Sequence, residues 1–294
     1  MDVFVAQLVT GLSIGSILLL AAVGLTLTFG QLGVINMAHG EFIMAGSYTA
    51  FVVQQIVSAA GGSLFLSLIA GFLVGGVMGL ILEVTMIRHL YHRPLDTLLI
   101  TFGVGLILQQ LARDLFGAAA VNVQAPGWLA GSVGLLGATV PKTRIFIFVL
   151  ALVCVGAIAL LLRYSPMGRR IRAVVQNRDL AETCGISTRR VDLLTFFIGS
   201  GLAGVAGVAL TLIGSTSSTI GQSYLINAFL VVVAGGLGQL HGAVIAAFSL
   251  GILQSFVEYA TTASIAQVVV LLAIVLFLQA RPEGLFRLKT RSLV

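Results

Sequence analysis

Residues 25–48 hold the polar side chains that most suggest a function. The stretch reads LTLTFGQLGVINMAHGEFIMAGSY, in which two glycines interrupt an apolar run and Asn36, His39 and Glu41 follow. Polar groups are costly at membrane depth, and where they occur they usually mark a solute path. Backbone that is not helical persists there only if it is buried in protein or lines a wet cavity. We therefore interpret the stretch as a broken membrane helix that lines a solute path.

Short patterns for catalysis and metal binding find no supporting context. G-x-S-x-G occurs at 11–15 and G-x-G-x-x-G at 199–204, but both lie inside apolar runs and not in strand–turn–helix units. His89 and His92 are spaced to share one helix face, and the sequence offers no third ligand beside them. We predict no catalytic residue and no metal site.

The sequence contains no Walker A motif for ATP, so active transport would need an ion gradient or a separate ATPase. Ion-coupled carriers usually hold acidic side chains inside their spans. Of the candidates, Glu83, Asp114 and Glu258 lie near predicted helix ends, which leaves Glu41 alone in an interior position. This distribution favours a separate ATPase over an ion-coupled carrier.

The composition is that of a helical membrane protein. The chain has 294 residues, of which 58% are hydrophobic and 9% are charged, against roughly 25% charged residues in soluble domains. Its basic residues lie in short loops, where they set membrane orientation, so the positive net charge does not indicate nucleic acid binding. Two cysteines, one in an apolar run and one in a basic loop, provide no disulfide framework.

Nine apolar runs predict an all-α fold with about eight or nine transmembrane helices, some broken or re-entrant, in a single domain over 1–294. The runs cover residues 5–29, 42–57, 64–87, 97–115, 145–162, 193–213, 224–233, 243–259 and 265–278. The loop at 117–143 is rich in Gly and Pro and poor in charge, and we expect it outside the cell. The loops at 88–93, 163–190 and 281–294 hold two, seven and four of the 16 Lys and Arg residues. The positive-inside rule places these three in the cytoplasm and the N-terminus outside.

Small residues spaced four apart predict close helix packing. In lipid, helices associate through close backbone approach at such positions. The pairs and triplets are Gly11/Gly15, Gly71/Gly75/Gly79, Ala203/Gly207 and Gly238/Gly242.

The two halves of the chain share a faint similarity. Gly-x-Leu-Gly followed by His-Gly and an apolar run occurs near residue 30 and again near residue 236. Paired interruptions of this kind indicate a transporter's binding site near the middle of the bilayer, within an internal pseudo-repeat. Chance similarity in such a biased composition explains the pattern equally well.

The longest charged segment is 163–190, RYSPMGRRIRAVVQNRDLAETCGISTRR. Its composition predicts an amphipathic helix over 167–184, with Pro166 at its start and Gly185 at its end. Gly168 and Gly185 would allow sharp turns at the two ends. The segment is either a basic loop that only sets orientation or a helix that docks against a cytoplasmic partner.

Three long stretches resemble one family of membrane proteins. FGQLGVINMAHGEFIMAGSY, SPMGRRIRAVVQNRDLAETCGI and VVVAGGLGQLHGAVIAA are similar, in this order, to the membrane (permease) subunits of ABC importers for branched-chain amino acids and urea. The resemblance extends from about residue 11 to 286. Within the family, RHLYHRPLDTLLITFGVGLILQQLARDLFGA and GSGLAGVAGVALTLIG look most like the urea permeases, and the branched-chain amino acid permeases are next.

The resemblance implies a multi-pass permease subunit in the bacterial inner membrane. It implies four kinds of association: a second, different permease subunit, two cytoplasmic ATPases, an external solute-binding protein and lipid. It implies no cofactor of the chain's own, because ATP is bound by the ATPases, and no enzymatic activity. It also places a coupling helix for an ATPase within 167–190, where the candidate contact residues are Gly168, Arg169, Arg170, Arg172, Asn177, Asp179, Glu182 and Gly185.

The expected solute is urea, which is small, neutral and planar. Neutral amide, hydroxyl and imidazole groups suit it, because buried polar groups that bond a solute reject analogues without those bonds. The candidate path residues, chosen by position, are Asn36, His39, Glu41, Thr101, Gln109 and Asn227. A branched-chain amino acid or a short amide is the alternative, and a zwitterion would favour a charged site or one lined by a helix terminus. A passive urea channel that needs no partner is the second alternative.

Overall fold

The computed structural model describes residues 2–57, 62–90, 93–135, 138–282 and 284–286. Within them lie eleven α-helices, two short 3-10 helices and one two-stranded hairpin, so the predicted all-α membrane fold is confirmed. The elements are α1 (Asp2–Leu32), α2 (His39–Ile56), α3 (Ser63–Thr85), η1 (Ile87–His89), α4 (Pro94–Phe116), η2 (Gly127–Leu129), β1 (Ser132–Leu135), β2 (Ala138–Pro141), α5 (Lys142–Tyr164), α6 (Pro166–Gln176), α7 (Arg178–Thr183), α8 (Thr188–Leu210), α9 (Ile220–Gly235), α10 (Leu240–Ala260) and α11 (Ala263–Ala280).

Each of the nine predicted apolar runs corresponds to one helix, and the two remaining helices, α6 and α7, lie in the basic segment. Seven of the nine helices are long and apolar enough to cross a membrane: α1, α3, α4, α5, α8, α10 and α11. The other two are shorter or more polar. α9 has 16 residues, and α2 begins with His39 and Glu41 in its first turn.

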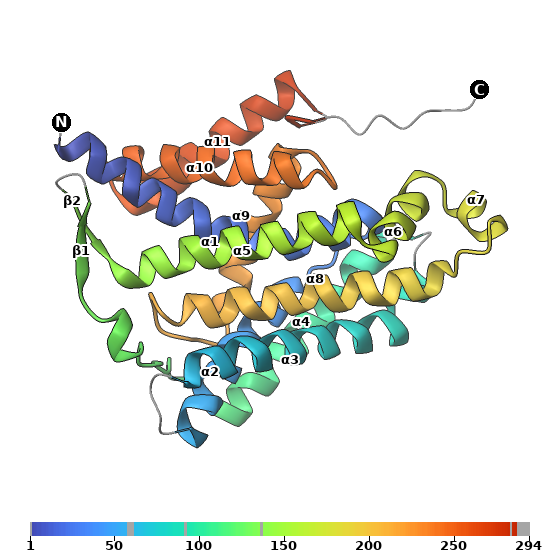
Figure 1. Ribbon diagram of the computed structural model, residues 1–294, viewed down its shortest axis with the longest axis horizontal. Coiled ribbons are helices and arrows are strands. Elements are labelled where there is room, and N and C mark those ends of the chain that lie inside the picture. The colour runs from blue at the N-terminus through green and yellow to red at the C-terminus, as the bar shows by residue number, and fades with distance from the viewer. Residues whose placement is uncertain (1, 58–61, 91–92, 136–137, 283, 287–294) are drawn as a thin grey trace.

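The two ends of the bundle differ in character. The N-terminus and the antiparallel β1–β2 hairpin lie at one end, which we call the hairpin end, while α6 and α7 lie at the opposite end (Figure 1). Residues 117–143 thus hold η2 and the hairpin, and Val121 of this loop pairs with Thr216. This separation is the one that the distribution of Lys and Arg requires, although the side of the membrane on which each end lies stays a prediction.

Glycines let α8 approach its neighbours at backbone distance. A Cβ on Gly204 would overlap the carbonyl oxygen of Gly71 in α3, and one on Gly207 would overlap that of Ile43 in α2. At the other side of the bundle, Gly11 and Gly15 of α1 lie against the backbone of α10. The predicted packing through small residues is therefore confirmed at these positions, and it holds α1, α2 and α3 around α8. The predicted pair Gly238/Gly242 does not share a helix, because Gly238 lies in the turn before α10.

The predicted break in the first membrane segment is present. α1 continues to Leu32, the backbone turns at Gly33 with φ 65°, and residues 33–38 are not helical. The ring nitrogen Nε2 of His39 then lies 3.3 Å from the carbonyl oxygen of Ala21. Since Ala21 precedes Leu32 by three turns of α1, the segment has returned by roughly 16 Å along that helix. α2 therefore starts part of the way down α1 and not at the bundle surface.

The second interruption is different, and the prediction of a matched pair at mid-bilayer is wrong in this respect. Residues 236–239 form a turn with positive φ at Gly236 and Gly238, and Gly238 packs on Gly30 close to the end of α1. His241 is exposed, whereas His39 is fully buried. Only the first interruption holds buried polar side chains at the level of the helix interior, and the pseudo-repeat stays a prediction.

A test of the glycine packing compares two alanine substitutions in different helices. Gly207→Ala should destabilise the protein by about 1–3 kcal/mol, because its methyl group would force α8 away from α2. Gly156→Ala in α5 adds the same methyl group where nothing lies within 4 Å, and it should be neutral or stabilising by up to about 1 kcal/mol. Thermal unfolding of the two purified variants in detergent measures the difference. Equal stabilities would contradict the packing described here.

Candidate functional site

Side chains satisfy two backbone N–H groups in the interruption between α1 and α2. The Oδ1 atom of Asn36 accepts a hydrogen bond from the backbone N–H of Ala38 at 3.0 Å. Thr101 of α4 accepts one from the N–H of Met37 at 3.0 Å and donates to the carbonyl of Thr97 at 2.8 Å. Because water is scarce at this depth, these bonds allow an extended segment to persist there.

Glu41 and Gln109 join α2 to α4. Nε2 of Gln109 donates to Oε1 of Glu41 at 2.8 Å, and the Glu41 side chain is only 2% exposed. Gly105, one turn before Gln109, lies against the Glu41 side chain, where a Cβ would stand 3.6 Å from its Cγ. The two predicted path residues from distant parts of the sequence therefore form one contact.

Three buried polar atoms of this cluster have no hydrogen-bond partner among the described residues: Nδ2 of Asn36, Nδ1 of His39 and Oε2 of Glu41. An unpaired polar atom that is removed from water is costly, so each of these atoms needs water or a solute beside it. The atoms include a donor and a carboxylate acceptor, and they stand at the N-terminus of α2, where the helix dipole is positive. The arrangement can bind a small polar solute, and it holds no activated nucleophile.

Five of the six predicted path residues thus lie around one interruption. His39 also connects α2 to α1. It is 0% exposed and bonds α1 through the Ala21 carbonyl, in a space that Gly24 leaves open. We call Asn36, His39, Glu41, Thr101 and Gln109 the break cluster.

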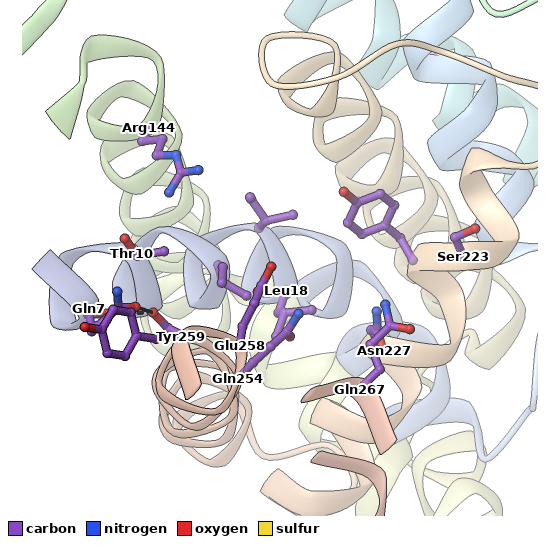
Figure 2. Close-up of a pocket in the computed structure, with 14 residues that line it drawn as sticks. Gln7, Thr10, Leu18, Arg144, Ser223, Asn227, Gln254, Glu258, Tyr259 and Gln267 are labelled. Carbon is purple, nitrogen blue, oxygen red and sulfur yellow. Dashed lines mark hydrogen bonds between the residues drawn. The ribbon is translucent and has the colours of Figure 1, made fainter. Parts of the chain in front are cut away.

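Asn227, the sixth predicted path residue, lies apart from the break cluster. It lines a polar cavity of about 530 Å³ between α1, α5, α9, α10 and α11 at the hairpin end (Figure 2). The same cavity contains Arg144, in the first turn of α5, and Glu258, which lies near the end of α10 as the sequence predicts. One sequence signal points to this cavity: Gln254 and Glu258 are four residues apart in an apolar run, and so share a helix face.

The basic segment contains two helices and not the single helix predicted over 167–184. Asn177 has extended backbone, with φ −160° and ψ 108°, and separates α6 from α7. Each helix has its own N-cap: Ser165 accepts from the N–H of Met167 at 3.0 Å, and Asn177 accepts from that of Leu180 at 2.9 Å. The capping preference of asparagine outweighs helix continuation at this position.

The predicted coupling residues divide into those that hold the segment and those that face outward. Gly185 has the expected positive φ, 79°, but Gly168 lies inside α6, where it lets that helix contact the carbonyls of Leu161 and Leu162. Arg172 also donates to the Leu162 carbonyl, and Glu182 accepts from Thr188. Arg169, Arg170 and Asp179 are exposed and belong to neither described ion pair.

Two features of this segment were not predicted. Arg178 of α7 forms an ion pair with the buried Asp192 of α8, with 2.5 Å between Nη2 and Oδ2. Leu180 of α7 is 55% exposed, although its neighbour Ala181 packs in a small apolar cluster with Ile171, Val174 and Val191. The ion pair and the cluster fix α6 and α7 to α8, and they leave Leu180 exposed.

Comparisons with known proteins identify the family. Residues 7–278 match the family described as "Branched-chain amino acid transport system / permease component". The chain is 30% identical to the high-affinity branched-chain amino acid transport system permease protein LivH of Salmonella typhimurium, over 96% of this chain and 95% of LivH. It is 31% identical to BraD of Pseudomonas aeruginosa, which has the same description, over the same shares of the two chains. It is 29% identical to a probable LivH of Methanocaldococcus jannaschii, over 83% of this chain and 78% of that protein.

Members of this family are transport subunits and not enzymes, and they act with ATPase and solute-binding partners. The match to the family and the seven apolar helices agree with each other along the whole chain. The chain therefore belongs to the family of branched-chain amino acid transport system permeases, as a multi-pass permease subunit of an ABC importer in the inner membrane.

Proposed function

We propose that this subunit forms part of the translocation path for branched-chain or similar aliphatic amino acids. The main support is the similarity to LivH and BraD along almost the full length of both chains. It favours the amino acid alternative over the urea substrate that the sequence analysis put first.

The break cluster is consistent with a zwitterionic solute. An amino acid carries an ammonium group, for which the free Oε2 atom of Glu41 is an acceptor, and a carboxylate, for which the N-terminus of α2 is favourable. Urea carries neither charge, so a buried carboxylate would contribute less to its binding. The main structural support for the proposal is that Glu41 is buried and that its Oε2 atom has no hydrogen-bond partner within the described part of the chain.

Energy would enter through α6 and α7. In this proposal, ATP binds to the partner ATPases, this chain holds no cofactor, and movement of the ATPases displaces the α6–α7 segment. That segment contacts α5, α8 and α1, and α1 and α8 in turn pack around His39. A displacement at this end would therefore reach the break cluster through packed helices and change which side it faces. A second permease subunit, different from this one, would complete the path.

Urea remains a second candidate because three side chains of the cluster are neutral. Asn36, Thr101 and Gln109 offer the amide and hydroxyl groups that urea would bond. A passive urea channel is the third possibility, and it would need no ATPase.

Competition uptake separates these substrates. The full complex is reconstituted in vesicles with ATP, and uptake of radiolabelled leucine is challenged with excess unlabelled leucine, urea and acetamide. We expect leucine alone to compete, because only a zwitterion would use both ends of the cluster. A second assay follows radiolabelled urea in the same vesicles. Urea uptake that leucine fails to block would overturn the amino acid assignment. Urea uptake without ATP would support the passive channel.

Adjacent glutamines on α4 provide a test of the break cluster. Gln109→Ala removes the hydrogen bond to Glu41 and should lower leucine uptake by roughly three- to tenfold, the range expected for one such bond in a membrane protein. Gln110→Ala is the matched control, because Gln110 is exposed and bonds Asp114 on the outer face of the same helix. Uptake by this control should stay within about twofold of the native value. Equal effects of the two substitutions would remove the cluster from the path.

Leu180 tests the docking of α7. Leu180→Ser should weaken association with the ATPase subunit by about tenfold, the loss expected when a buried leucine contact disappears. Co-purification of the two subunits at several salt concentrations measures it. Cys184→Ser, an exposed change in the same segment, serves as the control and should have no effect. Undiminished association of the Leu180 variant, and of one altered at Arg169, Arg170 and Asp179, would refute docking at this segment.

A further inference from the structure

The polar cavity at the hairpin end is separate from the break cluster, and its lining is not that of a packing defect. It has a volume of about 530 Å³, within the range of roughly 300–1,000 Å³ that is usual for ligand pockets. We propose that it is a binding site for a zwitterionic aliphatic amino acid, which occupies it before reaching the break cluster. The inference rests on the proposed function and adds a second site to it.

Two opposite charges face this cavity from different helices. Arg144 extends from the first turns of α5, and the carboxylate of Glu258 points into the cavity from α10 (Figure 2). Neither side chain belongs to an ion pair among the residues that the structure describes, although both line one space. A guanidinium group binds a carboxylate with two parallel hydrogen bonds, and a carboxylate accepts from an ammonium group. The pair therefore offers one partner for each charge of a free amino acid.

The lining of the cavity combines a polar wall of amide groups with an apolar wall. Asn227 of α9, Gln254 of α10 and Gln267 of α11 supply amide groups (Figure 2). α1 contributes the polar Gln7 and Thr10 near its start and, further along, the apolar Ile14, Ile17 and Leu18, which form an apolar wall. A solute with a charged head and a branched aliphatic side chain would satisfy both walls, whereas urea would leave the apolar wall against water.

The polar wall is held in place by a bond between α1 and α10. The hydroxyl of Ser255 lies 2.9 Å from the carbonyl oxygen of Gln7 and 2.8 Å from the side-chain Oε1 of the same residue. This fixes the helix that carries Gln254 and Glu258 relative to α1. The cavity therefore has a defined shape before any solute enters, which lowers the entropic cost of binding.

The position of the cavity gives it an order relative to the break cluster. Leu18 lines the cavity, and Ala21, less than one turn further along α1, accepts the contact of His39. A solute that leaves the cavity along α1 toward the α6–α7 end would meet the break cluster next. The cavity lies toward the hairpin end, which we expect to face the solute-binding protein.

Protection of a cysteine tests the site without measuring transport. Ser223 lines the cavity, so Ser223→Cys is made in a Cys184→Ser background, where the remaining Cys154 is buried. The purified complex, without solute-binding protein, is treated with a maleimide and millimolar leucine, leucinamide or 4-methylpentanoate. Leucinamide lacks the carboxylate and 4-methylpentanoate lacks the ammonium group. We expect leucine to slow labelling and each analogue to protect about tenfold more weakly, because one charge-assisted bond is lost.

Substitution of the two charges connects the protection to these residues. Arg144→Gln should abolish the advantage of leucine over leucinamide, and Glu258→Gln should abolish its advantage over 4-methylpentanoate. Lys142→Gln is the control, since it removes a positive charge two residues from Arg144 without lining the cavity. Ser215→Cys, exposed at the same end and outside the cavity, should be labelled at one rate in all conditions.

Three outcomes would overturn the inference. They are equal labelling with and without leucine, equal protection by all three compounds, and a Ser223→Cys variant that reacts only after denaturation. The two proposals fail in different assays. If the proposed function is wrong, the native complex takes up no leucine. If native uptake of leucine is present and protection is absent, only the cavity site is wrong.

Discussion

The close approach of backbones at glycines is the constraint on which the rest of this structure depends. α8 lies in the middle of the bundle, with Gly204 and Gly207 against the carbonyl oxygens of α3 and α2, and Gly199 against α1. At these points a single added methyl group would overlap a neighbouring backbone atom. In lipid, apolar side chains gain little by leaving one apolar environment for another, so contact between backbones largely determines which helices pair. This packing fixes the depth at which α2 begins and hence the position of every polar group near it.

The break cluster shows how polar groups are accommodated in such a bundle. Asn36 and Thr101 satisfy backbone N–H groups that an uninterrupted helix would have satisfied itself. Gln109 satisfies one oxygen of Glu41, and His39 bonds the carbonyl of Ala21. Nδ2 of Asn36, Nδ1 of His39 and Oε2 of Glu41 have no partner among the described residues, and in our proposal they face the solute. In this proposal, different atoms of the same side chain hold the fold and bind the solute.

α1 connects the two ends of the molecule. Its first half lines the cavity that contains Arg144 and Glu258, Ala21 near its middle contacts His39, and Gly30 near its end packs on the turn at Gly238. The α6–α7 segment contacts the same helix at the opposite end of the bundle from the cavity. A rigid helix with these three contacts can carry a displacement from the cytoplasmic partners, as proposed, to the places where a solute would bind.

The sequence by itself determined the class of protein, the nine apolar helices, the break after the first of them and the close packing at glycines. These follow from local properties: hydrophobic run length, the presence of Gly and polar residues within a run, and the four-residue spacing of small residues. Only the tertiary structure decided that Glu41 meets Gln109, that Asn227 belongs with Arg144 and Glu258, and that the turn at 236–239 lies away from the buried polar cluster. Those relations depend on the depth and rotation of each helix against its neighbours, and a chain position does not specify either. The division of the basic segment at Asn177 has both kinds of cause. The cap is local to Asn177, and the contacts of Ala181 and Arg178 then hold α7 in place.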